Sequence, residues 1–279
     1  MVTLKAHYPL AVLLEVAGLA RSTFFYHQAR LDRPDPHARL KQAVTDVFQQ
    51  AHGRYGHRRV HAMLHRHGLR PAKKTVLHIM RTLGLACTVR RRRRYSSWKG
   101  EAGTTAGNVL DRDFTAPAPN TKWVTDITEL RVGTSKIYLS PIIDLFDRSV
   151  VSYSWSTRPD THLTNSSLTK AIATLNTGHT PLVHTDQGFH YRHTSWRQLL
   201  HEANLTPSMS RKATCLDNAV AENFFSHLKE ELFHHHNYNT PDEFTTALEN
   251  YLDWYNTTRI STTLKNLTPT EYRAQALTT

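Results

Sequence analysis

Three acidic side chains stand where regular secondary structure should deliver them to a common point. Asp126 ends an apolar, strand-like run that begins at Lys122, and Asp186 ends a second run that begins at Pro181. Glu222 lies in the first turn of a helical stretch. Three carboxylates that meet in this way can hold two divalent cations roughly 3.5–4 Å apart, which activates one oxygen and stabilises another during phosphodiester exchange. Chemistry of this kind acts on nucleic acid.

The part of the chain that must position these carboxylates alternates between strands and helices. Strand-like runs bounded by turn residues lie at 122–130, 136–143, 150–155 and 182–185. Apolar residues at helical spacing mark helices at 161–176, 195–203, 219–233 and 241–255. The pattern predicts an α/β fold in which helices cover the faces of a mixed sheet.

The helix that carries the third carboxylate has other polar residues on the same face. Asn218, Ser226 and Lys229 stand at helical spacing from Glu222, so all four should point toward one groove. Asn218 and Lys229 are therefore candidates for DNA contact. Asn218 suits a helix cap equally well, and both interpretations stay open.

The first hundred residues have a helical pattern throughout. Two short helices at 10–15 and 23–30 are separated by Gly18, with Ser22 as the expected cap of the second, and the pair resembles a helix-turn-helix. Any antiparallel pair of helices shares this pattern, so DNA contact by the pair stays open. Three more helices follow Pro36 and should pack into a small DNA-binding module.

The formal charge of +12 is concentrated in that helical part. Residues 1–100 hold 20 Lys and Arg against 4 Asp and Glu, whereas residues 101–279 hold 15 against 19. This asymmetry is typical of an arm that binds a polyanion, although a merely soluble basic surface or a disordered basic linker would share it. The candidates for phosphate contact in the arm are Arg54, Arg58, Arg59, Lys73, Lys74, Arg90, Arg91, Arg92, Arg93 and Arg94.

Other classes of site find little support. The two cysteines, Cys87 and Cys215, lie far apart and form no CxxC pair, which argues against a disulfide framework or a thiolate zinc site. No apolar run approaches the roughly 20 residues of a membrane span. We therefore expect no membrane association and a protein of the reducing cytoplasm.

Two further kinds of chemistry fit the residues less well than carboxylate chemistry does. Two groups of histidines could bind zinc: His57, His61 and His65, spaced by four residues, and the run His234-His235-His236. Without thiolate partners they are better interpreted as surface and DNA-facing residues, and the run as an exposed loop. Tyr251 and Tyr255 near an arginine could suggest a tyrosine recombinase, but the rest of that constellation is missing.

The segments around the three carboxylates resemble a known family. They are Trp123-Val124-Thr125-Asp126-Ile127-Thr128, His184-Thr185-Asp186-Gln187-Gly188, Asp217-Asn218-Ala219-Val220-Ala221-Glu222-Asn223-Phe224-Phe225 and Leu228-Lys229. Together they are similar to the integrase-type (DDE) catalytic core of bacterial insertion-sequence transposases. The similarity is greatest to those made from two overlapping reading frames, of which this chain resembles the downstream-frame product. Outside the core, 53–59 resembles the start of that family's second helical DNA-binding module, and 255–269 resembles its C-terminal segment.

The resemblance implies a ribonuclease-H-like fold in which Asp126, Asp186 and Glu222 are the catalytic residues and bind two ions of Mg²⁺ or Mn²⁺. It further implies that water nicks DNA at the end of the element and that the freed 3′-hydroxyl attacks another phosphodiester, with no covalent protein intermediate. Lys229 would contact a phosphate. The implied partners are double-stranded DNA, as element terminal repeats and target, and further copies of the chain in at least a dimer on DNA.

A stretch rich in Gly, Ser, Thr, Ala and Pro before Asn120 marks a linker and hence a domain boundary. We expect a helix-turn-helix-like segment at 1–35, a helical DNA-binding module at 36–95, a basic and Pro/Ala-rich linker at 96–119, a catalytic core at 120–236 and a C-terminal helical segment at 237–279. The protein should associate with the nucleoid, and an upstream-frame segment is expected to be absent from it. Two alternatives are a DNA-binding regulator with an idle core and a ribonuclease-H-like nuclease that does not transpose.

Overall fold

The computed structural model describes residues 2–31, 34–88, 107–211 and 215–278. Its first helices are η1 (Thr3–Ala6), α1 (Leu10–Val16) and α2 (Arg21–Leu31). Gly18 separates α1 from α2 with a φ of 59°, a left-handed conformation that glycine adopts at little cost. The expected pair of helices is present. The capping role predicted for Ser22 is wrong, because α2 already begins at Arg21.

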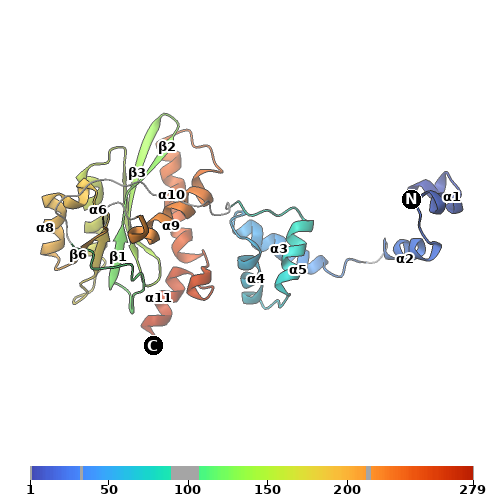
Figure 1. Cartoon of the computed structure of the whole chain (residues 1–279), viewed down its shortest axis with the longest axis horizontal. Helices are drawn as coiled ribbons and strands as arrows, with labels where there is room; N and C mark the ends of the chain where they lie inside the picture. The colour runs from blue at the N-terminus through green and yellow to red at the C-terminus, as the bar shows by residue number, and fades with distance from the viewer. Residues whose placement is uncertain (1, 32–33, 89–106, 212–214, 279) are drawn as a thin grey trace.

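The next three helices pack into a small module of their own (Figure 1). They are α3 (Ala38–Gln50), α4 (His57–Arg66) and α5 (Lys73–Thr82). The side chains that meet between them lie at helical spacing and are almost fully buried: Val44, Val47, Val60, Leu64, Val76 and Ile79. The core of this module also contains Ile260, from the far end of the chain.

The rest of the chain is built on a six-stranded mixed sheet. Its strands are β1 (Lys122–Thr125), β2 (Thr128–Val132), β3 (Ser135–Asp144), β4 (Val150–Ser156), β5 (Leu182–Thr185) and β6 (Thr206–Met209). The strand order is β2-β3-β1-β5-β6, with β4 also paired to β3. β1 is antiparallel to β3 and parallel to β5, and β5 is parallel to β6. The first predicted strand, 122–130, is in fact two, interrupted at Asp126 and Ile127.

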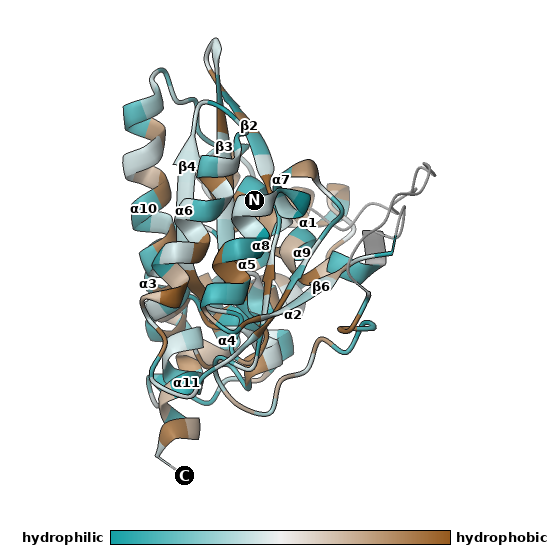
Figure 2. Ribbon diagram, turned by 90° about the vertical axis from the view of Figure 1, so that its left-hand side faces the viewer, coloured by the Kyte–Doolittle hydropathy of each residue, from teal (hydrophilic) through white to brown (hydrophobic). Residues whose placement is uncertain are grey.

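Helices cover both faces of this sheet, giving three layers (Figure 1). On one face lie α6 (Thr161–Ile172), α7 (Phe189–Arg192) and α8 (Thr194–Glu202). On the other lie α9 (Ala219–Leu228), its continuation η3 (Lys229–Phe233), which is one turn of π-helix, and α10 (Pro241–Thr257). Strand alternation divides the core between the faces: Trp123 packs with α6 and α8, and Val124 packs with α9 and α10. Figure 2 shows the mixed hydrophilic and hydrophobic colouring of α10 that such packing requires.

This architecture confirms the predicted α/β class with small helical modules in front of it. Sequence patterns missed β6 and α7, whereas α11 (Pro269–Leu277) lies in the C-terminal segment predicted to be helical, without having been located as a separate helix. β6 contains Pro207 and lies at the edge of the sheet, where a missing backbone donor is tolerated but the usual strand signal is lost.

Part of the predicted linker packs on the sheet domain. Residues 89–106, including Arg90 to Arg94, lie outside the described residues. From Gly107 onward, the chain inserts Leu110, which is 2% exposed, into the core beside α9. Phe114 and Ala116 pack against the same cluster. Among the described helices, none is long and apolar enough to cross a membrane.

Candidate active site

Two of the three carboxylates stand level with each other at one edge of the sheet. β1 and β5 run in the same direction, and their register pairs Val124 with His184. Asp126 and Asp186 each follow two residues later. Equal steps from a shared register on adjacent parallel strands place these two side chains close together. The interruption between β1 and β2 falls at Asp126 and Ile127. The antiparallel register with β3 continues across it, from Thr125 opposite Ile142 to Thr128 opposite Leu139.

The backbone holds each of these carboxylates in place. The N–H of Ile127 donates to Oδ1 of Asp126 at 2.8 Å, and the N–H of Gly188 donates to Oδ1 of Asp186 at 2.9 Å. A Cβ atom added to Gly188 would lie only 2.9 Å from Asp186 Oδ1. The absence of a side chain at position 188 therefore makes room for the carboxylate.

The third carboxylate comes from α9, which a side-chain hydrogen bond ties to the same edge of the sheet. Asn218 precedes α9, and its side-chain amide donates to the carbonyl oxygen of Thr125 at 3.1 Å. Asn218 is 4% exposed and makes no side-chain capping bond, so its side chain joins helix to strand instead of capping α9. Glu222, one turn later, is half-buried.

Burial and the two neighbouring carboxylates together perturb Asp126. Burial, and then the negative charges of Asp186 and Glu222, raise the pKa of Asp126 to about 7. Burial also raises the pKa of Asp186 and that of Glu222. The positive charge of Lys229 acts in the opposite direction and lowers the pKa of Asp126. Negative charge is thus concentrated at this edge of the sheet and is partly offset by Lys229.

The donor set fits a divalent cation. Carboxylate oxygens are hard ligands of the kind that Mg²⁺ prefers, and a cation between them would relieve the repulsion that raises the pKa of Asp126. The space left at Gly188 keeps Asp186 in this arrangement. As the described side chains stand, however, no three carboxylate, imidazole or thiol groups already surround one point closely enough to hold a metal. The structure brings the three acidic residues to one region without completing a coordination shell.

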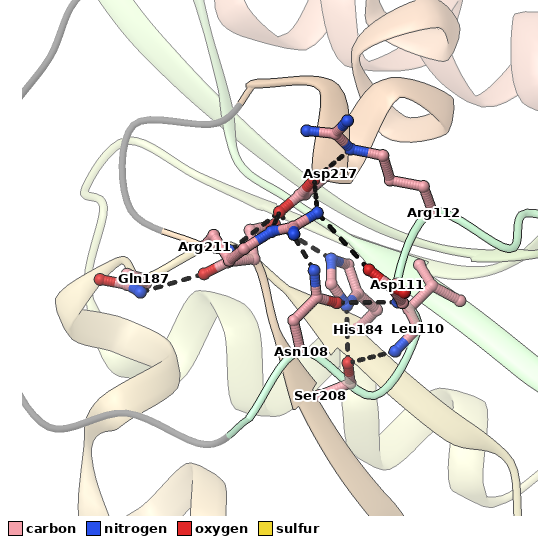
Figure 3. A network of polar contacts seen from close by, with 10 residues as sticks. Asn108, Leu110, Asp111, Arg112, His184, Gln187, Ser208, Arg211 and Asp217 are labelled. Carbon is pink, nitrogen blue, oxygen red and sulfur yellow. Dashed lines mark hydrogen bonds and ion pairs between the residues drawn. The ribbon is translucent and has the colours of Figure 1, made fainter.

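A buried aspartate that sequence analysis did not single out organises the chain beside this site (Figure 3). Asp217 is fully buried and accepts hydrogen bonds from Arg112 Nε at 2.6 Å and from Arg211 Nε at 3.0 Å. Asn108 donates to the same carboxylate at 3.1 Å. Asp217 therefore fastens the segment that enters the sheet domain to the residues that lead into α9.

The same network reaches the strand that carries Asp186. The ring of His184 contacts the hydroxyl groups of Ser208 and Ser210 at 2.8 and 3.0 Å, and Gln187 donates to the carbonyl oxygen of Ser210 at 3.0 Å (Figure 3). Burial lowers the pKa of His184 to about 4, so the imidazole is neutral at neutral pH. In the sequence, the nearness of His184 to Asp186 and of Asp217 to Glu222 could have pointed to these two residues. Their burial could not be predicted, because neither histidine nor aspartate is usually fully buried.

The residues predicted to contact DNA fall into different environments. Arg58, Lys73 and Lys74 are exposed on the helical module. Arg54 and Arg59 instead contact Glu231, a buried residue of η3. Asn218 is buried, Lys229 is half-buried, and the arginine run lies outside the described residues.

Some of the histidines considered as zinc ligands are exposed and others are half-buried. His234, His235 and His236 are exposed in a turn, and the rings of His61 and His65 lie 4.1 Å apart between their centroids. In the described part of the chain neither group joins a set of three potential metal ligands.

Family comparisons agree with this architecture. The Integrase core domain family matches residues 116–215 and again 222–277, and the HTH-like domain family matches 36–94. A solved simian T-cell lymphotropic virus intasome, in complex with a PP2A regulatory subunit, contains a chain with a TM-score of 0.50 and 22% identity. The alignment covers 76% of this chain and 70% of that one, and it supports the fold alone.

Three similar proteins are named as transposases of insertion sequences. InsK of IS150 in Escherichia coli K12 is 46% identical over 98% of this chain and 96% of its own length. The IS1353 protein of Shigella flexneri is 40% identical over 97% of this chain, which spans only 53% of that relative. InsF of IS3A in E. coli K12 is 30% identical over 98% of this chain and 96% of its own length. With identity along almost the whole chain and an integrase-type core, the protein belongs to the integrase-core transposases of bacterial insertion sequences, which are polynucleotidyl transferases acting on DNA.

Proposed function

We propose that Asp126, Asp186 and Glu222 are the catalytic residues and that they hold two ions of Mg²⁺ or Mn²⁺. The observation that carries this assignment is the shared register of β1 and β5, which sets Asp126 level with Asp186, together with the bond that ties α9 and Glu222 to Thr125. When bound, such ions supply the Lewis-acid polarisation and the activated oxygen that phosphodiester exchange needs.

The reaction is the cleavage of DNA at the ends of the insertion sequence, followed by joining of the freed 3′ end to a target. In this reaction the three carboxylates supply ligand oxygens, and the backbone N–H groups of Ile127 and Gly188 keep two of them oriented. Lys229 lies within reach of Asp126 and is suited to hold a phosphate oxygen. Asn218 acts indirectly, because its hydrogen bond to Thr125 fixes the start of α9 on β1.

Double-stranded DNA is the substrate, both as element ends and as target. Because two ends must be processed together, the active form is at least a dimer on DNA. The HTH-like module at 36–94 supports end recognition, and its exposed cations Arg58, Lys73 and Lys74 are the proposed phosphate contacts. Such a substrate would place the protein at the bacterial nucleoid.

The test uses the full chain, DNA carrying the element's own ends, and Mg²⁺. Replacing Asp186 with Asn, or Glu222 with Gln, keeps the shape but removes a ligand charge, and cleavage and joining should both fall by roughly a hundredfold or more because several kcal/mol of transition-state stabilisation are removed. Binding of the ends, measured by fluorescence anisotropy, should persist.

Glu202→Gln is the matched control, because Glu202 is an exposed carboxylate on α8 and its replacement should leave the rates unchanged. Cleavage without joined products would identify a nuclease that does not transpose. Binding of ends without Mg²⁺-dependent cleavage by the unaltered chain would identify a regulator with an idle core.

A further inference from the structure

A fully buried carboxylate lies at the end of the helix that carries Glu222. Glu231 belongs to η3, the π-helical turn that continues α9, and its side chain has no exposed surface. An unpaired charge in such a place is strongly unfavourable, so the groups that surround it must compensate. π-helical turns within α-helices are also frequent at functional sites.

Part of the compensation comes from the C-terminal region. Arg259 donates from Nε to Oε2 and from Nη2 to Oε1, each at 2.8 Å, and the hydroxyl of Tyr251 donates to Oε2 at 3.0 Å. Although burial works to raise the pKa of Glu231, the charge of Arg259 holds it below the usual value. The pair is therefore ionised and satisfied within the sheet domain.

Two more arginines reach the same residue from the helical module. Nη1 of Arg59 lies 3.5 Å from Oε1 of Glu231, and Nε of Arg54 donates to the backbone oxygen of Glu231 at 3.0 Å. The guanidinium of Arg54 also lies 4.5 Å from the centre of the Trp254 ring, a cation–π contact. Both arginines are thus directed into the protein.

An apolar contact accompanies these ionic ones. Ile260 has no exposed surface and completes the core of the helical module. Tyr55, 3% exposed, accepts a hydrogen bond from the Ile260 N–H at 2.9 Å and donates to the Thr258 carbonyl oxygen at 3.2 Å. The module accordingly lies on the α9–α10 side of the sheet domain (Figure 1). A contact that combines a fully buried apolar side chain with hydrogen bonds running in both directions is typical of an internal interface.

We propose that Glu231 is a positioning residue: by holding Arg54 and Arg59 of the helical module, it fixes that module on the end of the catalytic helix and keeps Lys229 and Glu222 in place. The inference deepens the proposed function, on which the roles of Lys229 and Glu222 rest. It also reassigns Arg54 and Arg59 from phosphate contact to an internal contact. DNA bound by the exposed face of the module is then held at a fixed position relative to the carboxylates.

Arg59→Gln in the full chain tests the contact itself. This change leaves Arg259 on Glu231, so no buried charge is stranded and the protein should fold. Hydrogen exchange of the peptide containing Ile260 should become roughly tenfold faster, because the module opens more often. Arg66→Gln is the matched control: it removes the same charge from α4, but its partner Glu271 is 37% exposed, and exposed pairs contribute little. Unchanged exchange in Arg59→Gln would overturn the proposal.

Cleavage of element ends in a single turnover, at saturating DNA, tests the positioning. Arg59→Gln should slow cleavage by roughly tenfold or more, because small misplacements of catalytic groups have large effects on rate. DNA affinity and its salt dependence should not change, and Arg59→Lys should restore part of the rate. Weaker binding with a lower salt slope and an unchanged rate would show that Arg59 contacts phosphate instead, which contradicts the proposal.

The two failures can be told apart. If Asp186→Asn still cleaves DNA, the proposed function is wrong, whereas the exchange result for Arg59→Gln does not depend on catalysis.

Discussion

At the scale of single residues, the absence of a side chain at position 188 is as important as the carboxylate beside it. Gly188 has an ordinary negative φ of −56°, so alanine would meet no backbone strain there. Its Cβ, however, would stand 2.9 Å from Asp186 Oδ1, well inside normal contact distance. The hydrogen bond from the Gly188 N–H to the carboxylate depends on this close approach.

Gly188→Ala should therefore displace the Asp186 carboxylate and lower Mg²⁺-dependent cleavage by roughly tenfold to a hundredfold, since ligand geometry is disturbed by several tenths of an ångström. DNA binding should be unaffected. Gly107→Ala is the matched control, because a Cβ at that position meets nothing within 4 Å and its φ is not in the left-handed region. Cleavage at the normal rate by Gly188→Ala would show that Asp186 does not need its present position.

At the scale of elements, the Asp217 network joins segments that no regular hydrogen-bond ladder connects. It links the chain around Asn108 and Arg112 to Arg211 and thereby to the entrance of α9 (Figure 3). Hydrogen bonds and ion pairs from these groups lower the pKa of Asp217 to about 2, even though burial opposes the shift. A carboxyl group whose folded-state pKa is depressed stabilises the folded state above its unfolded-state pKa.

Asp217→Asn should reduce the free energy of unfolding by about 1 kcal/mol at neutral pH, because the lost ion pairs run to Arg112 and Arg211, whose side chains are 43% and 53% exposed and therefore screened by solvent. The sign sets the pH window: the difference between wild type and variant is constant above about pH 4 and shrinks as pH falls toward 2, because protonated Asp217 no longer makes the same interactions. Thermal unfolding of both proteins at several pH values measures this. A difference that stays constant down to about pH 2 would contradict the assigned ion pairs.

At the scale of the whole molecule, the cations of the helical module lie in different environments. Lys73 and Lys74 stand at the start of α5 and are exposed, whereas Arg54 and Arg59 contact Glu231. Of these four cations, the two lysines remain accessible to a DNA duplex. The basic residues of the first hundred positions therefore do not form one uniform exposed surface.

Replacing both Lys73 and Lys74 with Ala should weaken binding to any duplex, because fewer phosphates are then neutralised. The slope of log affinity against log salt should fall by about 0.9 for each phosphate that the variant no longer neutralises. Fluorescence anisotropy between about 50 and about 200 mM salt measures the slope. Lys136→Ala serves as the control, because Lys136 is paired with Glu129 at 3.0 Å on the sheet domain. An unchanged slope in the double variant would remove α5 from the DNA interface.

Much of the fold and the carboxylate site was predictable because the signals are local. The apolar run at 182–185 predicted β5 correctly, and the helical pattern after Pro36 predicted the three helices α3, α4 and α5. Because Asp126 and Asp186 each follow a strand-like run, the sequence predicted that the two carboxylates would lie at the ends of strands. β6 was not predicted, because a strand of four residues that contains Pro207 is too short for a recognisable alternation of apolar and polar side chains.

The amino-acid sequence was sufficient to predict most of the elements and which of their ends bear carboxylates, since helix and strand preferences and the step of two along a strand depend on near neighbours. Which partner each charged side chain contacts was decided only by the tertiary structure. Arg54 and Glu231 are 177 residues apart, and Ile260 enters the core of a module whose last described helix ends at Thr82. An arginine looks the same in sequence whether it faces a phosphate or a buried carboxylate, because that choice depends on which distant segment covers it.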